Sequence, residues 1–278
     1  MKKVYFGLLS FASLGLVNSA FAEDAPQVKT PGATPQIQAS AQPSTSNFTS
    51  AQLGEIEKIV ADYLVKHPEI VMTALQAGKE AEQKEAVAKM EKAVFDNKDK
   101  IFKDASAPTA GNLKGTQSLV VFMDPYCGYC KKFHAELVTL LKTNKDVKVI
   151  FKDIPIMGKD SIVAIKAMLA AKEQGKYDQL QNAIYTSDKN LKRKELLKLA
   201  SSVGIDTKKL EADMKGKAAQ EQVDKNLELS KALGINGTPT LIVGETKVMP
   251  GFVVADELNK LLKEAAATDN KVASAKSS

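Results

Sequence analysis

Two cysteines, Cys127 and Cys130, have the clearest chemical potential in this sequence, and they are the only cysteines among its 278 residues. They follow a continuous apolar run of strand length, 119–123, which is typical of a strand buried on both faces. An Asp-Pro pair ends this run, and from Gly128 onward apolar residues recur at helical spacing. The pattern predicts Cys127 at the N-terminus of a helix and Cys130 about one turn inside it.

This placement favours redox chemistry. The first turn of a helix has unpaired N–H groups and a partial positive charge, and both stabilise the thiolate that attacks disulfides. Cys130 can close a disulfide with Cys127, so the pair can cycle through a mixed disulfide with a substrate. A structural disulfide over so small a loop would stabilise little. A zinc site would need more ligands, and His67 and His134 are the only other soft candidates.

A second motif, Gly237-Thr238-Pro239, directly precedes the apolar and β-branched run 240–243. Proline is tolerated at the start of a strand, where its missing N–H removes no ladder hydrogen bond. A Cys-x-x-Cys pair after one strand and Gly-Thr-Pro before another resemble the thioredoxin fold. The resemblance implies that Pro239 is cis and lies against the cysteines; without it, an ordinary trans proline would be the simpler interpretation.

The first 22 residues have the pattern of a secretory signal peptide, with two lysines, an apolar stretch and an Ala-x-Ala cleavage site ending at Ala22. Residues 23–47 are rich in Pro, Thr, Ser, Ala and Gln, which predicts a disordered linker. No later segment approaches the roughly 18 apolar residues of a membrane span, so we expect a mature protein that is not embedded in the membrane. Export to an oxidising compartment, most simply a bacterial periplasm, agrees with redox-active cysteines.

The formal net charge of +6 is mild, and two of the lysines belong to the signal peptide. Proteins that bind nucleic acids more often concentrate basic residues in a patch with aromatic side chains. We therefore expect no nucleic-acid partner.

Residues 48–105 predict a helical extension. Apolar residues recur at helical spacing from Leu53, are interrupted at His67-Pro68, and resume through Lys- and Glu-rich sequence to Val94. A long helix with a narrow apolar stripe cannot bury that stripe by itself. It packs either on the next domain or on another copy of the chain, and its position before the cysteines favours self-association, most simply as a homodimer.

Residues 106–268 predict an α/β domain. A loop at 107–112 marks its start, and strands are expected at 119–123 and 147–154. Helical patterns fill about 158–233, ending at glycines that have the position of C-terminal stops.

The domain closes with the strand after Pro239, a second short strand, and a last helix around 255–264. Residues 269–278 are expected to form a polar tail.

Together these features resemble the DsbA-like thiol-disulfide oxidoreductases, in the subgroup with an N-terminal helical oligomerisation extension. The resemblance implies an α/β thioredoxin fold with an inserted helical domain, preceded by an α-helical extension. The motifs that carry it are Phe122-Met123-Asp124, Cys127-Gly128-Tyr129-Cys130, Phe151-Lys152-Asp153-Ile154-Pro155, Gly237-Thr238-Pro239-Thr240 and Pro250-Gly251-Phe252.

The residues between the cysteines differ from those of the strongly oxidising archetype, which has Pro-His there. Tyr129 cannot supply the positive charge with which a histidine stabilises the thiolate, so we expect a less oxidising disulfide. Gly128-Tyr129 together with Thr238 before the proline is similar to the DsbC-type disulfide isomerases, whose dimerisation keeps the oxidising membrane partner away.

The archetype also has a buried glutamate six residues before the first cysteine, where this chain has Val121. Because valine cannot carry a proton, we expect no proton relay through position 121. Lys152 and Asp124 are the charged residues of the matching motifs that could compensate.

These patterns predict a periplasmic thiol-disulfide oxidoreductase, in the first place a disulfide isomerase for exported proteins, without a cofactor or a metal. Cys127 attacks the substrate disulfide and Cys130 resolves the mixed disulfide. A membrane redox partner is implied, which is reducing for an isomerase and oxidising for an oxidase. The alternatives are a DsbA-like oxidase that donates disulfides and a non-catalytic envelope chaperone or structural protein. The residues expected to shape the active site and the substrate-binding surface are Gly128, Tyr129, Thr238 and Pro239.

Overall fold

The protein is described from a computed structural model that places residues 48–188 and 191–276; the expected signal peptide and linker lie outside these ranges. The chain divides into two compact units, residues 1–65 and 66–278. The described part of the first unit is essentially α1 (Ser50–Lys66), none of whose residues is buried. Thr49 begins this helix with reciprocal hydrogen bonds, because its Oγ1 accepts from the Gln52 N–H at 3.3 Å and Gln52 Oε1 accepts from the Thr49 N–H at 2.8 Å.

The second unit begins with α2 (Pro68–Asp96) and α3 (Lys98–Phe102). His67 holds the N-cap position of α2, and Pro68 follows as the first helical residue. A proline fits there because the first N–H groups of a helix have no intrahelical partner. The predicted interruption at His67-Pro68 is confirmed.

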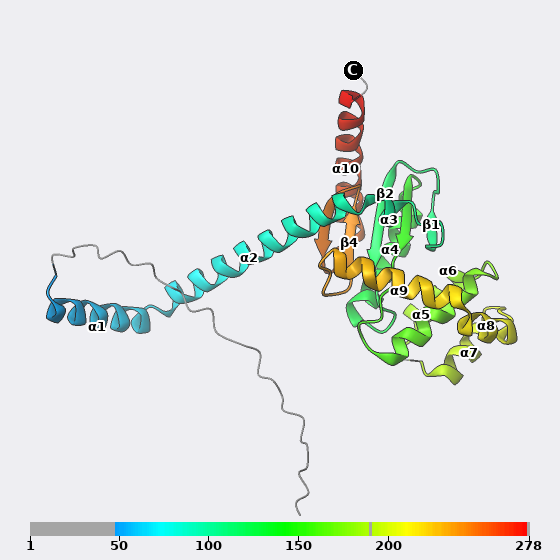
Figure 1. The fold of residues 1–278 in the computed structure, drawn as a ribbon, viewed down its shortest axis with the longest axis horizontal. Coiled ribbons are helices and arrows are strands. Elements are labelled where there is room, and N and C mark those ends of the chain that lie inside the picture. The colour runs from blue at the N-terminus through cyan, green and yellow to red at the C-terminus, as the bar shows by residue number, and fades with distance from the viewer. Residues whose placement is uncertain (1–47, 189–190, 277–278) are drawn as a thin grey trace, which may run out of the picture. The chain divides into compact units, whose positions relative to one another are not determined.

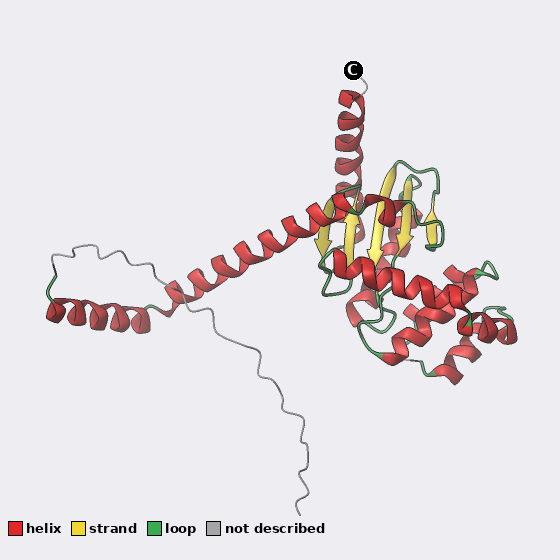
Figure 2. Ribbon diagram, viewed as in Figure 1, coloured by secondary structure: helices red, strands yellow, loops and turns green. Residues whose placement is uncertain are grey.

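The second unit is built on a five-stranded mixed sheet (Figures 1 and 2) with the strand order β1-β3-β2-β4-β5. Strands β2 and β3 are parallel, and every other neighbouring pair is antiparallel. The strand bounds are β1 (Thr109–Gly111), β2 (Gln117–Phe122), β3 (Val147–Phe151), β4 (Thr240–Val243) and β5 (Lys247–Pro250). Strand β1 lies where a loop was expected, because a three-residue strand is too short to leave a period in the sequence.

Five helices of the sheet-containing unit, α5–α9, form the helical insert. They join β3 to β4, and Figure 2 shows them gathered largely at one end of the sheet. Helix α10 continues to Lys276, beyond the helix expected at 255–264 and into the residues expected as a polar tail. The bounds are α4 (Gly128–Thr143), α5 (Lys159–Lys172), α6 (Tyr177–Tyr185), α7 (Arg193–Ser202), α8 (Thr207–Lys215), α9 (Lys217–Ala232) and α10 (Ala255–Lys276).

The alternation of side chains along the strands creates a core on each face of the sheet. Leu119 and Val121 of β2 belong to the larger core, which also contains residues of α4, α5, α6 and α10. Val120 and Phe122 face the other way, into a second core completed by α9 and by residues of the helical extension, Val94 and Ile101. The end of the extension is thus part of the folded second unit.

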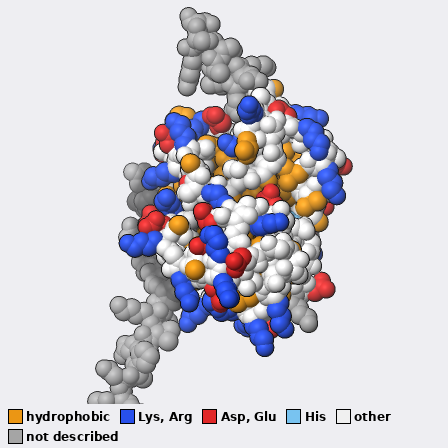
Figure 3. Space-filling model, turned by 90° about the vertical axis from the view of Figure 1, so that its right-hand side faces the viewer, with side chains coloured by type: hydrophobic (Ala, Val, Ile, Leu, Met, Phe, Trp, Pro, Cys, Tyr) orange, Lys and Arg blue, Asp and Glu red, His pale blue; other side chains and the backbone are white. Residues whose placement is uncertain are grey.

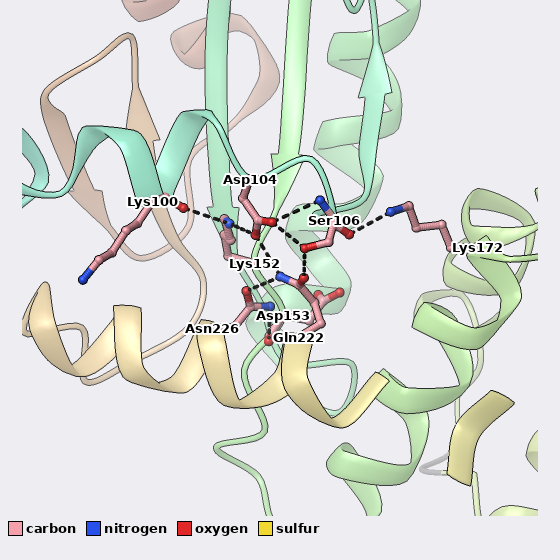
Figure 4. Close-up of polar contacts among 8 residues, drawn as sticks. All are labelled: Lys100, Asp104, Ser106, Lys152, Asp153, Lys172, Gln222 and Asn226. Atoms are coloured by element: carbon pink, nitrogen blue, oxygen red, sulfur yellow. Dashed lines mark hydrogen bonds and ion pairs between the residues drawn. The ribbon is translucent and has the colours of Figure 1, made fainter. Parts of the chain in front are cut away.

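Polar contacts fasten the same end of the extension (Figure 4). Lys152, at the end of β3, pairs with Asp104 at 2.6 Å, and Gln222 of α9 donates to the same carboxylate at 3.0 Å. Helix α2 also contacts β5, where a Glu91 carboxylate oxygen accepts from the Val248 N–H at 3.3 Å. On the face shown in Figure 3, acidic side chains lie among the Lys and Arg side chains.

Among the helices of residues 48–188 and 191–276, none combines the length and apolar character that crossing a bilayer requires.

Candidate redox site

Cys127 holds the N-cap position of α4, with extended backbone angles of φ −74° and ψ 122°. Its N–H donates to the Asp124 carbonyl at 3.1 Å, and its carbonyl accepts from the Lys131 N–H at 3.0 Å. The Asp-Pro turn after β2 therefore places the Cys127 thiol at the start of α4, as the sequence predicted.

The second motif lies against the first. The Thr238–Pro239 peptide bond is cis, as the resemblance implied, and the Cys127 Sγ donates to the Thr238 carbonyl at 3.3 Å. The Pro239 carbonyl in turn accepts from the Gly251 N–H at 2.8 Å. Hydrogen bonds thus connect the Cys-x-x-Cys motif, the Gly-Thr-Pro motif and the Pro-Gly-Phe motif, which are separate in the sequence.

The two thiols differ in environment. Cys127 retains 9% exposure and Cys130 retains none. Burial raises the pKa of the Cys130 thiol, opposed in part by the neighbouring Thr238 side chain. Cys130 is therefore held as a protonated thiol beneath Cys127, which lies nearer the surface.

Gly128 and Tyr129 form the first turn of α4. The Tyr129 side chain is 64% exposed, and the Lys132 Nζ lies 5.4 Å from its ring centroid. This aromatic side chain is therefore available to a molecule that approaches Cys127.

Asp124 stabilises the turn that joins β2 to α4. Its buried carboxylate accepts from the Tyr126 N–H and the Ser161 hydroxyl, both at 2.8 Å, and from the Met157 N–H at 2.8 Å. The charge is thus satisfied by three donors and fixes the turn that carries Cys127. Sequence reasoning had noted Asp124 only as a possible substitute for a glutamate; its position directly after the strand was the signal for this role.

Exposed apolar residues lie in two turns bonded to the site. Ile156 and Met157 belong to the turn that Asp124 holds, and Phe252 follows Gly251, which is bonded to Pro239. Together with Tyr129 they expose apolar side chains on the segments that surround the thiol pair.

Lys152 and Asp153 point to opposite faces of the sheet. Lys152 is committed to its ion pair with Asp104 on the α9 face, whereas Asp153 accepts from the Tyr177 hydroxyl at 2.6 Å on the face that holds α4 and α6. The Lys152 side chain therefore points away from the two thiols. The alternation of faces along 147–154 was visible in the sequence, but the partners of Asp153 were not.

No three His, Cys, Asp or Glu side chains in the described ranges are placed together so as to hold a metal ion. His67 begins α2, and His134 lies on α4 with its Nε2 3.1 Å from Asn182 Oδ1. The two histidines therefore do not join the cysteines in one ligand set.

A thiol pair at a helix N-terminus, packed against a cis proline that begins a strand, defines the class of thiol-disulfide oxidoreductases with a thioredoxin fold. The chain belongs to the family of the DSBA-like thioredoxin domain, which matches residues 118–263. Residues 54–89 match a second family, the N-terminal domain of the copper resistance protein ScsC.

Several solved structures are similar to this chain. A linker-deletion mutant of ScsC from Proteus mirabilis is 29% identical, with a TM-score of 0.60, and covers 81% of this chain and 100% of its own. A thioredoxin-like oxidoreductase from Silicibacter pomeroyi is 33% identical, with a TM-score of 0.58, covering 60% of this chain and 96% of its own. The thiol-disulfide exchange protein alpha-DsbA2 from Wolbachia pipientis is 28% identical, with a TM-score of 0.59, and covers 63% of this chain and 95% of its own.

A curated relative, the Na(+)/H(+) antiporter NhaA of Herminiimonas arsenicoxydans, is 26% identical over 141 residues. The match spans 49% of this chain but only 22% of that protein.

Proposed function

We propose that the protein is a periplasmic thiol-disulfide isomerase and oxidoreductase for exported proteins. The observation that carries the proposal is the asymmetry of the thiols, with Cys127 near the surface at the start of α4 and Cys130 fully buried behind it. Cys127 attacks the substrate disulfide, because it is the more accessible of the two thiols and lies at the N-terminus of α4. Cys130 then resolves the mixed disulfide.

Thr238 and Pro239 shape the surface on which the substrate lies, together with Gly128 and Tyr129. An extended chain can pair with exposed backbone beside the cis proline, and apolar side chains at Ile156 and Phe252 add contacts of low sequence specificity. This fits substrates that are incompletely folded.

Isomerisation is favoured over oxidation by the residues around the thiols. Tyr129 places no positive charge beside Cys127, so the disulfide is expected to be less oxidising than one with a histidine there. An isomerase works from the dithiol form and therefore needs a reducing membrane partner; the alternative, an oxidase, needs an oxidising one.

Self-association through α1 and the first part of α2 is the second component of the proposal, with a homodimer as the simplest assembly. Support comes from the exposed apolar residues of these helices, Leu53, Ile56, Val60, Ile70, Met72 and Leu75, in the region that matches the ScsC N-terminal domain.

A periplasmic location is supported by the signal-peptide pattern of residues 1–22. A relative described as a periplasmic thioredoxin-like protein, from Salmonella enterica serovar Typhimurium, is 26% identical with a TM-score of 0.53.

Reactivation of a scrambled-disulfide substrate tests the isomerase function. The mature protein is compared with a form lacking residues 23–80, a deletion that spares Val87, Val94 and Ile101 and so preserves the second core. We expect strong reactivation by the mature protein and a clear loss on deletion. Rapid oxidation of a reduced substrate with no reactivation would instead identify an oxidase.

Trapping tests the roles of the two cysteines. Cys130→Ala removes the resolving thiol and should accumulate mixed disulfides with exported proteins, whereas Cys127→Ala should accumulate none. Non-reducing electrophoresis with mass spectrometry detects them. The reverse pattern would exchange the two roles.

A further inference from the structure

Strand β1 forms one border of the sheet, and no described strand pairs with its outer side. Figure 2 shows it as the outermost strand. Its pairing with β3 is antiparallel, and the Asn112 N–H donates to the Val147 carbonyl at 2.8 Å. Because backbone groups alternate in direction along an antiparallel strand, those of Ala110 point toward β3 and those of Thr109 and Gly111 point outward.

The outward groups of β1 can bind a further strand. Among the described residues, neither Thr109 nor Gly111 has a backbone partner on that side. An extended peptide parallel to β1 can place one residue opposite Ala110. The N–H of that peptide residue would donate to the Thr109 carbonyl, and its carbonyl would accept from the Gly111 N–H. Residues that lie opposite each other in a sheet project their side chains to the same face, so this peptide side chain would follow that of Ala110.

A cavity of about 240 Å³ lies on the face to which Ala110 points. Ala110 packs against the larger core and lines the cavity together with Gly111 and Phe151. Most of the lining is apolar, and a cavity of roughly 150 Å³ is already large enough to bind benzene. The space beside the outer edge of β1 therefore suits an aromatic side chain. Helix α4 lines it with four residues of one helix face, His134, Leu137, Val138 and Leu141.

Helix α6 gives the cavity a polar side, formed by Asp178, Gln181 and Asn182. Gln181 donates to the Tyr177 hydroxyl at 3.1 Å, and Asn182 Oδ1 lies 3.1 Å from His134 Nε2. The Asp178 carboxyl has no hydrogen-bond or ion-pair partner among the described residues, and partial burial raises its pKa. A ligand side chain with a hydrogen-bond donor at its tip would satisfy this carboxyl, and the tyrosine hydroxyl is such a donor.

We propose that the outer edge of β1 and this cavity form a second binding surface for the substrate polypeptide. An extended segment of the substrate adds to the sheet beside β1 and places an aromatic side chain, in the first place tyrosine, in the cavity. The proposal rests on the proposed function for the identity of the occupant. Incompletely folded chains offer both features, because their backbone is unpaired and their aromatic side chains are not yet buried.

The position of β1 supports this occupant. Thr109 lies opposite Ile150, near the end of β3, and β3 is parallel to β2, which leads to Cys127. The start of β1 and the more accessible thiol are therefore at the same end of the sheet. Contacts outside the thiol pair would hold a substrate between successive exchange steps, which an isomerase requires and a single oxidation does not.

Peptide binding to the mature protein tests the surface. The probe is acetyl-Thr-Val-Tyr-Val-Thr-amide, compared with a peptide that has alanine for tyrosine and with one that has a methyl group on the tyrosine backbone nitrogen. The tyrosine peptide should protect residues 107–112 from hydrogen exchange, as measured by mass spectrometry. The two altered peptides should bind about tenfold more weakly, because one lacks the aromatic anchor and the other lacks the N–H for the Thr109 carbonyl.

Val138→Trp fills the cavity from α4 and should weaken binding of the tyrosine peptide about tenfold, as measured by calorimetry. Ala135→Trp is the matched control, because it adds the same side chain at an exposed position of α4 outside the cavity, and it should change binding by less than about twofold. Equal affinity of the tyrosine and alanine peptides would overturn the proposal, and this comparison needs no variant that folds. Equal losses in the two variants would also overturn it.

Competition tests whether the occupant is the substrate. The tyrosine peptide should inhibit reduction of a protein disulfide and leave reduction of oxidised glutathione unchanged, because glutathione has no extended segment long enough for β1. Inhibition of both reactions, or of neither, would overturn the proposal. Protection of residues 107–112 before peptide is added would also overturn it, because the edge would already be occupied by a second copy or by another part of the chain.

The peptides contain no cysteine, so their binding does not depend on the thiols. Binding at β1 by a protein that reduces neither disulfide would therefore support the surface and contradict the redox function. Reduction of both disulfides without peptide binding would support the redox function and overturn the surface.

Discussion

At the scale of residues, Asp153 illustrates how burial turns an ordinary acid into a group that titrates near neutrality. Its unfolded pKa is 3.8 and its folded pKa is about 7, chiefly because burial disfavours the charged form. Between these values the unfolded chain has lost the proton and the folded chain keeps it. The unfolded state then binds fewer protons, so the free energy of unfolding falls as pH rises through this window.

Asp153→Asn should remove this dependence. Relative to the unaltered protein, the variant should gain stability as pH rises from about 4 to about 7, by up to roughly 1.4 kcal/mol for each pKa unit of the shift. Urea unfolding at a series of pH values measures the difference. A difference that stays constant with pH would show that Asp153 is ionised throughout this range.

At the scale of elements, the ion pair between Lys152 and Asp104 joins the end of β3 to the residues that follow α3. Burial by itself would raise the pKa of Asp104, but hydrogen bonds from Lys152, Ser106 and Gln222 hold it well below its usual range. Its contribution to stability is therefore present above the unfolded pKa and is lost as pH falls.

Lys152→Met should destabilise the protein by about 3 kcal/mol, because it leaves a largely buried carboxylate without its cation. Chemical denaturation measures the loss. Lys225→Met is the matched control, since Lys225 lies near the same pair but is exposed, and it should change little. Replacing both partners, with Lys152→Met and Asp104→Leu, should recover most of the stability; an equal loss in the double variant would contradict this account.

Helices and strands with a regular spacing of apolar residues could be predicted from the sequence. The contacts between these elements could not. The run 119–123 and the helical spacing after Gly128 were sufficient to place β2, α4 and Cys127. Strand β1 was missed because three residues carry no period. The stacking of Tyr185 on His134 was missed because it depends on how α6 packs against α4, which no local pattern encodes.

At the scale of the whole molecule, the apolar stripe of α1 is the feature that predicts assembly. Leu53, Ile56 and Val60 recur at helical spacing and are exposed. Exchanging all three for Gln should convert an assembled protein into a monomer, as measured by analytical ultracentrifugation. Lys58→Gln with Asp62→Asn is the control on the opposite side of the helix and should leave assembly intact. An unaltered protein that sediments as a monomer would contradict self-association.

The contact between Glu91 and Val248 has a further consequence. An outer strand of a sheet presents backbone groups to which any extended polypeptide can add, and this is a common start of aggregation. The last turns of α2 lie against β5, and Glu91 binds the Val248 N–H. This outer strand is therefore covered by a helix, and under the proposed function an unfolded substrate could not add to the sheet along it.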